Sequence, residues 1–225
     1  MAARVFVWLG GALFVLSLAF CAWSYVVVMG RLAPATGWTA LAIDAALLTL
    51  FALHHSLFAR EPVKDVIARM IPADLVRSFY VWIASTLLIL VCALWRSIGS
   101  ELYTVRGLLA IVVVAVQLGG LWITARSAAR INPLELAGIR PPSPSRGLQV
   151  GGPYQWVRHP LYLGWMLMVF ATPHMTGDRL TFAAITTGYL MVAIPWEERS
   201  LRRTFGDHYA RYMRAVKWRM IPFIY

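Results

Sequence analysis

Long apolar runs alternate with short polar segments along most of the chain, and only the C-terminal part departs from this pattern. Four runs, Val5–Met29, Trp38–Phe58, Arg77–Trp95 and Leu108–Ala125, approach the length of about 20 residues that a helix needs to cross a bilayer core. The connections are short, so neighbouring helices are expected to be antiparallel. Because backbone groups in lipid must be satisfied within each segment, the pattern predicts an all-α, polytopic transmembrane helical bundle.

A C-terminal helical hairpin is predicted after the four spanning helices. Its first leg, Leu161–Thr172, would be about 18 Å long at 1.5 Å per residue, so it either spans with difficulty or is re-entrant. Pro173 ends this leg, and Leu180–Ile194 forms the returning one. Pro160 suits a helix start, where a missing N–H costs nothing. Pro195 predicts the end of the second leg.

Beyond the hairpin, apolar residues recur about every four positions, as on one face of an amphipathic helix. These positions are Trp196, Leu201, Phe205, Tyr209, Tyr212 and Val216. The arginines of this segment fall mostly elsewhere around the helix: Arg199, Arg202, Arg203, Arg211 and Arg214. We therefore expect a helix along the cytoplasmic membrane interface, kinked near Gly206.

Composition agrees with a membrane protein. The chain is 60% hydrophobic and 14% charged, against about 25% charged residues in soluble domains. The net charge is +11, and the basic residues lie between apolar runs, which indicates loops facing anionic lipid rather than nucleic acid. Their distribution predicts that both termini lie in the cytoplasm. The first apolar run exceeds the 7–15 residues of a signal-peptide core, so it predicts a retained helix.

The segment Arg158-His159-Pro160-Leu161-Tyr162 is the first candidate for chemistry. It lies at a predicted helix start, where free N–H groups and the helix dipole favour an anionic group such as a carboxylate. His159 would donate to that carboxylate, and Tyr154, Trp156 and Tyr162 would enclose a planar base. The alternative is an ordinary interfacial belt of Arg, Trp and Tyr.

The adjacent acids Glu197 and Glu198 are the second candidate. Neighbours on a helix point about 100° apart, so at most one faces a given pocket directly. Such a carboxylate would attract a sulfonium, bind ribose hydroxyls or accept a proton; the alternative is charge that complements a helix dipole. His54 and His55 end the second apolar run and cannot share a helix face, which argues against a metal site. One of them is a candidate for facing a substrate.

Other polar and reactive residues lie inside apolar runs. Asp44 and Gln117 are polar residues inside predicted spans, so each is expected either to have a functional role or to form a hydrogen bond between helices. Cys21 and Cys92 read as small core residues, with neither a disulfide framework nor a zinc site indicated. The sequence contains no G-x-G-x-x-G, P-loop, HExxH or GxSxG motif. Any nucleotide-like cofactor would therefore bind without a Rossmann domain.

Taken together, the motifs of the last third of the chain resemble the isoprenylcysteine carboxyl methyltransferase family. They are Gly152-Pro153-Tyr154, Arg158-His159-Pro160-x-Tyr162-x-Gly164, Glu197-Glu198, Phe205-Gly206-x-x-Tyr209-x-x-Tyr212 and Ile221-Pro222. That family includes phospholipid amine methyltransferases and bacterial methanethiol S-methyltransferases. The stretches HHSLFAR and ATPHMTGDRLTFAAITTGYLMVAI look closest to the methanethiol branch.

The resemblance implies an S-adenosylmethionine-dependent methyltransferase of the EC 2.1.1 class, which forms S-adenosylhomocysteine and uses no metal. It implies one domain over residues 1–225, with a transmembrane scaffold at 1–126 and a cofactor-binding and catalytic region at 146–225. The family's cofactor contacts fall on Arg146, Gly147, Leu148, Gln149, Tyr154, His159, Pro160, Leu161, Tyr162 and Glu197.

The methyl acceptor is indicated by one departure from the family pattern. Similar isoprenylcysteine enzymes carry an arginine four residues before the cofactor-binding glutamate, and here that position is Ala193. A carboxylate nucleophile would lose its bidentate partner, which favours a small or hydrophobic thiol. Deprotonation would then be assisted by Glu198, His54 or His55.

Three other functions stay open at this point. They are carboxyl methylation of isoprenylcysteine, N-methylation of a phospholipid amine, and a non-catalytic membrane binding or transport protein of the same fold. A lipid-like acceptor and membrane lipids are expected partners, nucleic acid is not, and the sequence leaves the oligomeric state undetermined.

Overall fold

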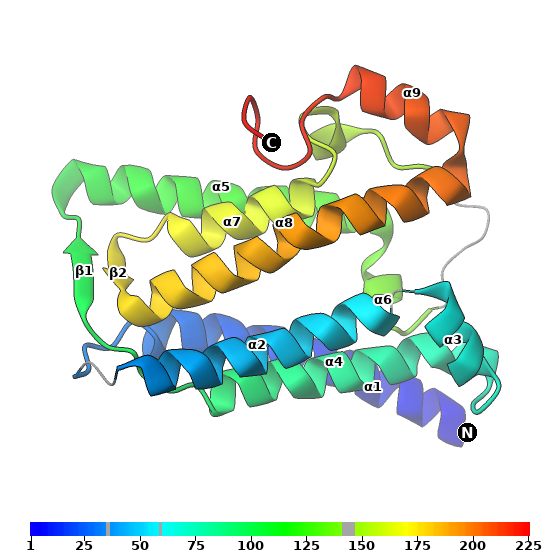
Figure 1. The fold of residues 1–225 in the computed structure, drawn as a ribbon, viewed down its shortest axis with the longest axis horizontal. Coiled ribbons are helices and arrows are strands. Elements are labelled where there is room, and N and C mark those ends of the chain that lie inside the picture. The colour runs from blue at the N-terminus through cyan, green and yellow to red at the C-terminus, as the bar shows by residue number, and fades with distance from the viewer. Residues whose placement is uncertain (35–36, 59, 141–146) are drawn as a thin grey trace. The chain divides into compact units, whose positions relative to one another are not determined.

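A computed structural model describes residues 1–34, 37–58, 60–140 and 147–225 of the chain (Figure 1). The helices are α1 (Ala2–Trp23), α2 (Trp38–Phe58), α3 (Glu61–Ala68), α4 (Val76–Ala93), α5 (Gly107–Ile131), α6 (Pro133–Leu136), α7 (Pro160–Phe170), α8 (Gly177–Phe205) and α9 (Asp207–Ala215). Shorter elements are the π-helical turn η1 (Ser24–Val28), the 3₁₀ turns η2 (Ala73–Leu75) and η3 (Gly152–Gln155), and the strands β1 (Glu101–Thr104) and β2 (His174–Thr176). The all-α polytopic prediction is confirmed.

These elements form two compact units that are interleaved in sequence. The first comprises Met1–Glu101, Pro133–Ser143 and Thr176–Arg179. The second comprises Leu102–Asn132, Pro144–Met175 and Leu180–Tyr225. The expectation of a single domain stays a prediction.

In the first unit, α1 and α2 each pack against α4 (Figure 1). All three are long and apolar enough to cross a membrane, as is α5 of the second unit. The expected span Trp38–Phe58 is confirmed residue for residue, whereas the first expected span is divided into α1 and the π-helical η1. The absence of a side chain at Gly10 lets the Trp82 ring lie against α1, where its Nε1 donates to the Phe6 carbonyl at 3.1 Å.

Two buried carboxylates of the first unit hold the loop that follows α4. Asp178 accepts hydrogen bonds from Trp95 Nε1 at 2.7 Å and from the Ile98 N–H at 2.9 Å. Asp44, inside α2, accepts the Arg96 N–H at 2.9 Å. The contact of Asp44 agrees with the interpretation of this residue as a hydrogen-bonding group between segments.

In the second unit, α7 lies between α5 and α8 (Figure 1). A Cβ on Gly120 of α5 would come within 2.7 Å of the Gly164 carbonyl oxygen of α7, so both helices need glycine where they cross. Near this crossing, Gln117 Nε2 donates to the Met168 carbonyl at 2.8 Å. On the other side of α7, Trp165 Nε1 donates to Thr186 Oγ1 of α8 at 3.1 Å.

This crossing gives a prediction in which two neighbouring glycines behave oppositely. Gly120→Ala should lower the free energy of unfolding by about 1–3 kcal/mol, because the new methyl group would clash with the α7 backbone. Gly119→Ala should raise it by about 0.5–1 kcal/mol, since no atom lies within 4 Å of its Cβ position and alanine favours helix. Chemical denaturation in detergent would measure both. Equal effects of the two variants would contradict the tight crossing.

The hairpin differs from its prediction in its turn. Its first leg is α7, with 11 residues, or about 16 Å, which is shorter than a bilayer core of about 30 Å. The segment after Pro173 was expected to be a plain turn. Instead it includes β2, which pairs with β1 in a two-stranded sheet, and the Val105 N–H donates to the Pro173 carbonyl at 2.7 Å.

The prediction that Pro195 ends the second leg is wrong. Helix α8 continues through Pro195 to Phe205. A proline inside a helix leaves the carbonyl four residues earlier without its N–H partner, here that of Met191. The Tyr225 hydroxyl donates to this carbonyl at 3.4 Å, which replaces the missing bond and lets the helix continue.

The expected kink near Gly206 is a complete break between α8 and α9. Gly206 has φ 51° and ψ −126°, a conformation that side chains disfavour. The chain therefore changes direction at this glycine, and the arginine-rich C-terminal region forms two helices instead of one.

Candidate functional site

The turn that precedes α7 is held by the C-terminal segment. The Arg158 N–H donates to the Trp218 carbonyl at 2.9 Å, and the His159 N–H donates to the Arg219 carbonyl at 2.7 Å. Arg158 Nη1 also donates to the carbonyls of Val216 and Lys217, at 2.8 and 2.7 Å. Residues far apart in sequence thereby fix the two side chains that begin the helix, and Pro160 is the first residue of that helix.

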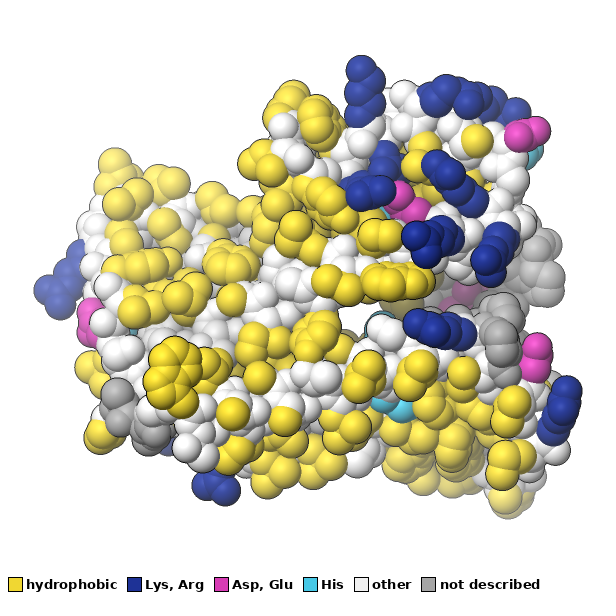
Figure 2. Space-filling model, viewed as in Figure 1, with side chains coloured by type: hydrophobic (Ala, Val, Ile, Leu, Met, Phe, Trp, Pro, Cys, Tyr) yellow, Lys and Arg dark blue, Asp and Glu magenta, His cyan; other side chains and the backbone are white. Residues whose placement is uncertain are grey.

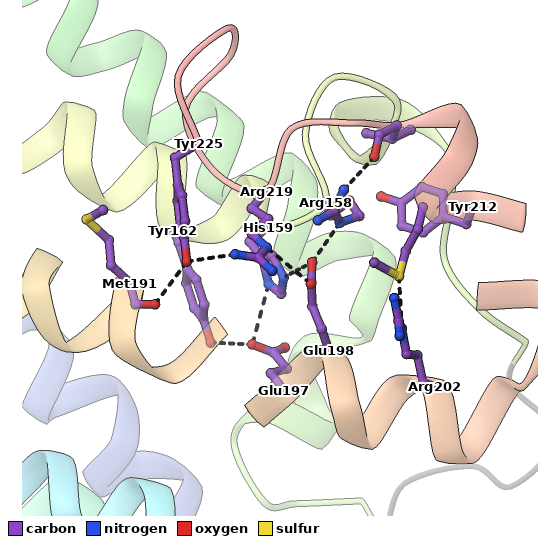
Figure 3. Close-up of polar contacts among 12 residues, drawn as sticks. Arg158, His159, Tyr162, Met191, Glu197, Glu198, Arg202, Tyr212, Arg219 and Tyr225 are labelled. Atoms are coloured by element: carbon purple, nitrogen blue, oxygen red, sulfur yellow. Dashed lines mark hydrogen bonds and ion pairs between the residues drawn. The ribbon is translucent and has the colours of Figure 1, made fainter. Parts of the chain in front are cut away.

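Glu198 of α8 lies at the centre of a buried charge cluster (Figure 3). Its Oε1 is 2.6 Å from Arg158 Nε and 3.4 Å from His159 Nε2, and its Oε2 is 3.3 Å from Arg219 Nε. Burial by itself would raise the pKa of this carboxyl, but contacts with His159 and Arg158 outweigh it and lower the pKa to about 2. Glu198 is therefore an anion at neutral pH.

Glu197 diverges from Glu198, as expected for its neighbour on a helix, and its carboxylate faces Tyr162 and His159 at the edge of the cluster (Figure 3). Its side chain is 43% exposed. Its Oε2 accepts the Tyr162 hydroxyl at 2.8 Å and lies 3.4 Å from His159 Nδ1. Helix α8 thus presents a half-exposed carboxylate to the tyrosine and the histidine at the start of α7.

His159 lies between the two glutamates. Its burial would lower the pKa of the imidazole, but contacts with Glu197 and Glu198 and their negative charges outweigh this, so the pKa is raised. Within the described part of the chain, His159 Nε2 is buried without a hydrogen bond of good geometry. The side chain can hold a proton, and its Nε2 faces Glu198 Oε1 without a well-aligned hydrogen bond.

The raised pKa of His159 predicts how stability depends on pH. A group whose pKa is raised by folding contributes stability below its unfolded value, here near 6.5, and loses that contribution as pH rises through the folded value. The Glu198 contribution stays constant over this range, because its pKa is about 2. The unfolding temperature of the wild type should therefore fall toward that of His159→Gln between pH 6 and pH 9. A difference that does not change with pH would contradict this prediction.

An aromatic cluster adjoins the charges. It consists of Tyr154, Tyr209, Tyr212 and Val216, with Leu148 packed against it. The Tyr212 hydroxyl donates to the Tyr154 carbonyl at 2.7 Å. Burial, together with the charge of Glu197, raises the pKa of Tyr154 to about 12, so its hydroxyl stays protonated.

The structure brings together only some of the residues expected to bind a cofactor. His159, Tyr162 and Glu197 contact one another directly. The others lie around them in the second unit: Tyr154 and Leu148 in the aromatic cluster, Pro160 and Leu161 in the first turn of α7, and Gly147 and Gln149 in the preceding loop, where Gln149 Nε2 donates to the Gly147 carbonyl at 3.2 Å. Arg146 lies outside the described residues.

His54 and His55, the expected histidines of α2, belong to the first unit and differ in their surroundings. The Tyr80 hydroxyl lies 2.5 Å from His55 Nδ1. The His54 ring is buried, with its centroid 4.3 Å from that of Phe58 and 5.4 Å from that of Tyr80. Neither His54 ring nitrogen has a hydrogen-bond partner among the residues that the structure describes.

Sequence reasoning missed one residue of the charge cluster, Arg219, and one contact within it, the ion pair of Arg158. Arg219 contacts Glu198, and its Nη1 donates to the Tyr225 hydroxyl at 3.3 Å. Arg158 was part of the motif, but its ion pair with Glu198 was not expected. No local signal identified these contacts, because Arg158 and Arg219 lie 40 and 21 positions from Glu198 along the chain.

Comparison with known proteins agrees with this C-terminal motif. The chain is 40% identical over 195 residues to a methanethiol S-methyltransferase of Crocosphaera subtropica. The aligned residues cover 83% of this chain and 76% of that protein. It is 37% identical over 186 residues to a methanethiol S-methyltransferase of Mycobacterium tuberculosis, and the aligned residues cover 79% of this chain and 76% of that protein. A third, methanethiol S-methyltransferase 2 of Bradyrhizobium diazoefficiens, is 36% identical over 185 residues, with 79% and 71% covered. The chain belongs to the methanethiol S-methyltransferase family.

Membership of the methanethiol S-methyltransferase family makes the chain a methyltransferase, and its four long apolar helices make it an integral membrane protein. No family model and no solved structure matches the chain. The expected resemblance, including its methanethiol branch, is confirmed.

Proposed function

We propose that this chain transfers a methyl group from S-adenosylmethionine to the sulfur of a small thiol, with methanethiol as the acceptor. The names of its relatives support the thiol. Ala193 supports it as well, because no arginine occupies the position where a substrate carboxylate would be bound. Bacterial inner-membrane localisation, with both termini in the cytoplasm, belongs to the same proposal.

The observation that carries the cofactor proposal is the position of His159 at the start of α7, where its buried ring lies between Glu197 and Glu198 and its Nε2 makes no hydrogen bond of good geometry in the described structure. A protonated imidazole beside a helix N-terminus suits the carboxylate of the methionine moiety. The half-exposed Glu197 suits ribose hydroxyls or the cationic end of the molecule. When bound, S-adenosylmethionine supplies a methyl group on a sulfonium. The remaining expected contacts would enclose it: Arg146, Gly147, Leu148, Gln149, Tyr154, Pro160, Leu161 and Tyr162.

Chemistry at the acceptor requires removal of a proton, because the thiolate rather than the thiol attacks carbon. The thiolate sulfur forms the new bond to the methyl carbon as the bond from that carbon to the sulfonium breaks, and the thiol proton goes to a base. The role of the protein is to align the two sulfur groups and exclude water.

Among the three candidate bases, His54 fits best. Glu198 has a pKa of about 2 and is held by two arginines, so it is a poor proton acceptor at neutral pH. His55 already contacts the Tyr80 hydroxyl. A buried neutral imidazole has one N–H and one acceptor nitrogen that both need partners, and those of His54 have none in the described structure. We assign the proton-accepting role to His54 from these surroundings alone.

The test is label transfer from methyl-labelled S-adenosylmethionine by the purified full chain in detergent. Methanethiol, a prenylcysteine analogue and phosphatidylethanolamine are offered separately, with His159→Ala in parallel. We expect label in volatile dimethyl sulfide from the wild type and a loss of S-adenosylhomocysteine binding in the variant. Label in either of the other acceptors would overturn the thiol assignment. No transfer and no S-adenosylhomocysteine binding would favour a non-catalytic protein.

A further inference from the structure

A cavity of about 460 Å³ lies at the break between α8 and α9, within the second unit. It is lined by Arg202 of α8, by Gly206 at the break, and by Ala210, Met213 and Arg214 of α9. Apart from its chain neighbours, no described residue has an atom within 4 Å of the Cβ position on Gly206, so the break leaves open space beside it. This volume falls in the range of about 300–1,000 Å³ that is typical of small-molecule sites.

The polar groups that line this cavity are two guanidinium groups. Arg202 Nε lies 3.3 Å from Met213 Sδ, and a thioether is only a weak acceptor. Throughout the described parts of the chain, no carboxylate forms an ion pair with Arg202 or Arg214. Two exposed guanidinium groups at one cavity, both without an acidic partner, favour an anionic ligand with several oxygen atoms.

The surface around the cavity is also positively charged. Lys and Arg side chains gather over the C-terminal half of α8 and over α9 (Figure 2). The exposed basic residues of this region are Arg199, Arg202, Arg203, Arg211, Arg214 and Lys217, against two exposed acids, Glu197 and Asp207. Such a surface concentrates anions near the cavity.

Membrane lipid is the source of anions that this unit meets. Helix α5 is long and apolar enough to span a bilayer. Near its C-terminal end, Trp122 stacks on Trp156 with ring centroids 6.1 Å apart, and both rings are about half exposed. Exposed tryptophans of this kind are typical of the headgroup level, and Trp196 of α8 is 53% exposed as well. Basic residues at that level bind anionic headgroups.

We propose that the cavity between α8 and α9 binds the phosphate group of an anionic membrane phospholipid, with Arg202 and Arg214 as its ligands. This site does not depend on the proposed methyl transfer. It lies outside the Glu197, Glu198 and His159 cluster and uses none of those side chains.

Native mass spectrometry of the full chain in detergent would test this, with phosphatidylglycerol and phosphatidylcholine of identical acyl chains as probes. Arg202→Gln with Arg214→Gln removes the ligands. Arg199→Gln with Arg203→Gln is the matched control, because it removes the same charge from exposed positions that do not line the cavity. We expect the wild type to retain phosphatidylglycerol over phosphatidylcholine, and the cavity variant to bind it at least about tenfold more weakly than the control variant.

Three results would overturn the proposal. If both double variants bound phosphatidylglycerol equally weakly, the lipid would be attracted by the overall positive charge of the surface, and the cavity would not be a specific site. Equal retention of the two lipids by the wild type, which needs no variant, would show that anionic lipid is not recognised. Displacement of phosphatidylglycerol by low-millimolar inorganic phosphate would assign the cavity to a free anion instead.

Discussion

Replacing His54 with asparagine is expected to lower the turnover of thiol methylation by about 10²–10⁴-fold, the usual contribution of a general base. The reason is that both ring nitrogens are buried and unpartnered in the described structure, so the side chain is available to take a proton. Initial rates of dimethyl sulfide formation would measure the loss. Because a larger fraction of the thiol is ionised at high pH, the deficit of the variant should shrink as pH rises.

His55→Asn is the matched control, since it removes a neighbouring imidazole from the same helix. Its effect on turnover should be small by comparison, because His55 is already in contact with Tyr80. S-adenosylhomocysteine binding should be unchanged in both variants. If His54→Asn retained full turnover, or lost the same fraction at every pH, then His54 would not act as the base.

Replacing Glu198 with glutamine is expected to lower the free energy of unfolding by about 3 kcal/mol. The change leaves Arg158 buried without its anionic partner and weakens the contact with Arg219, and breaking one member of a buried ion pair typically costs about 3–5 kcal/mol. Denaturation in detergent near neutral pH would measure the effect, because Glu198, with a pKa of about 2, is fully ionised there.

Glu197→Gln separates the roles of the two adjacent acids. The Glu197 side chain is 43% exposed, so its replacement should change stability by less than about 1 kcal/mol. It should instead weaken S-adenosylhomocysteine binding. If Glu198→Gln left stability unchanged, the charge cluster would not be the structural centre of this site.

The proximity of several predicted site residues could be expected from sequence, because their signals are local. His159, Pro160 and Tyr162 fall within one helical turn, so their spacing alone brings them together, and the divergence of Glu197 from Glu198 follows from helix geometry. The contact between His159 and Glu197 joins residues on two helices and was suggested only by the family resemblance. The proposal of His54 over Glu198 and His55 as the base rests on burial and hydrogen bonding, which distinguish residues that sequence treats alike.

The sequence by itself determined the membrane-spanning helices, because the length of an apolar run and the need to satisfy backbone groups in lipid are local properties. It also determined the family, through motifs that retain their order and spacing. Only the tertiary structure decided that α8 continues through Pro195, since the hydroxyl that replaces the missing hydrogen bond belongs to Tyr225. It alone decided that Glu198 is an ion-paired anchor, because its partners Arg158 and Arg219 lie 40 and 21 positions away. A proline or a carboxylate behaves according to the groups that fold against it, and local sequence does not specify those groups.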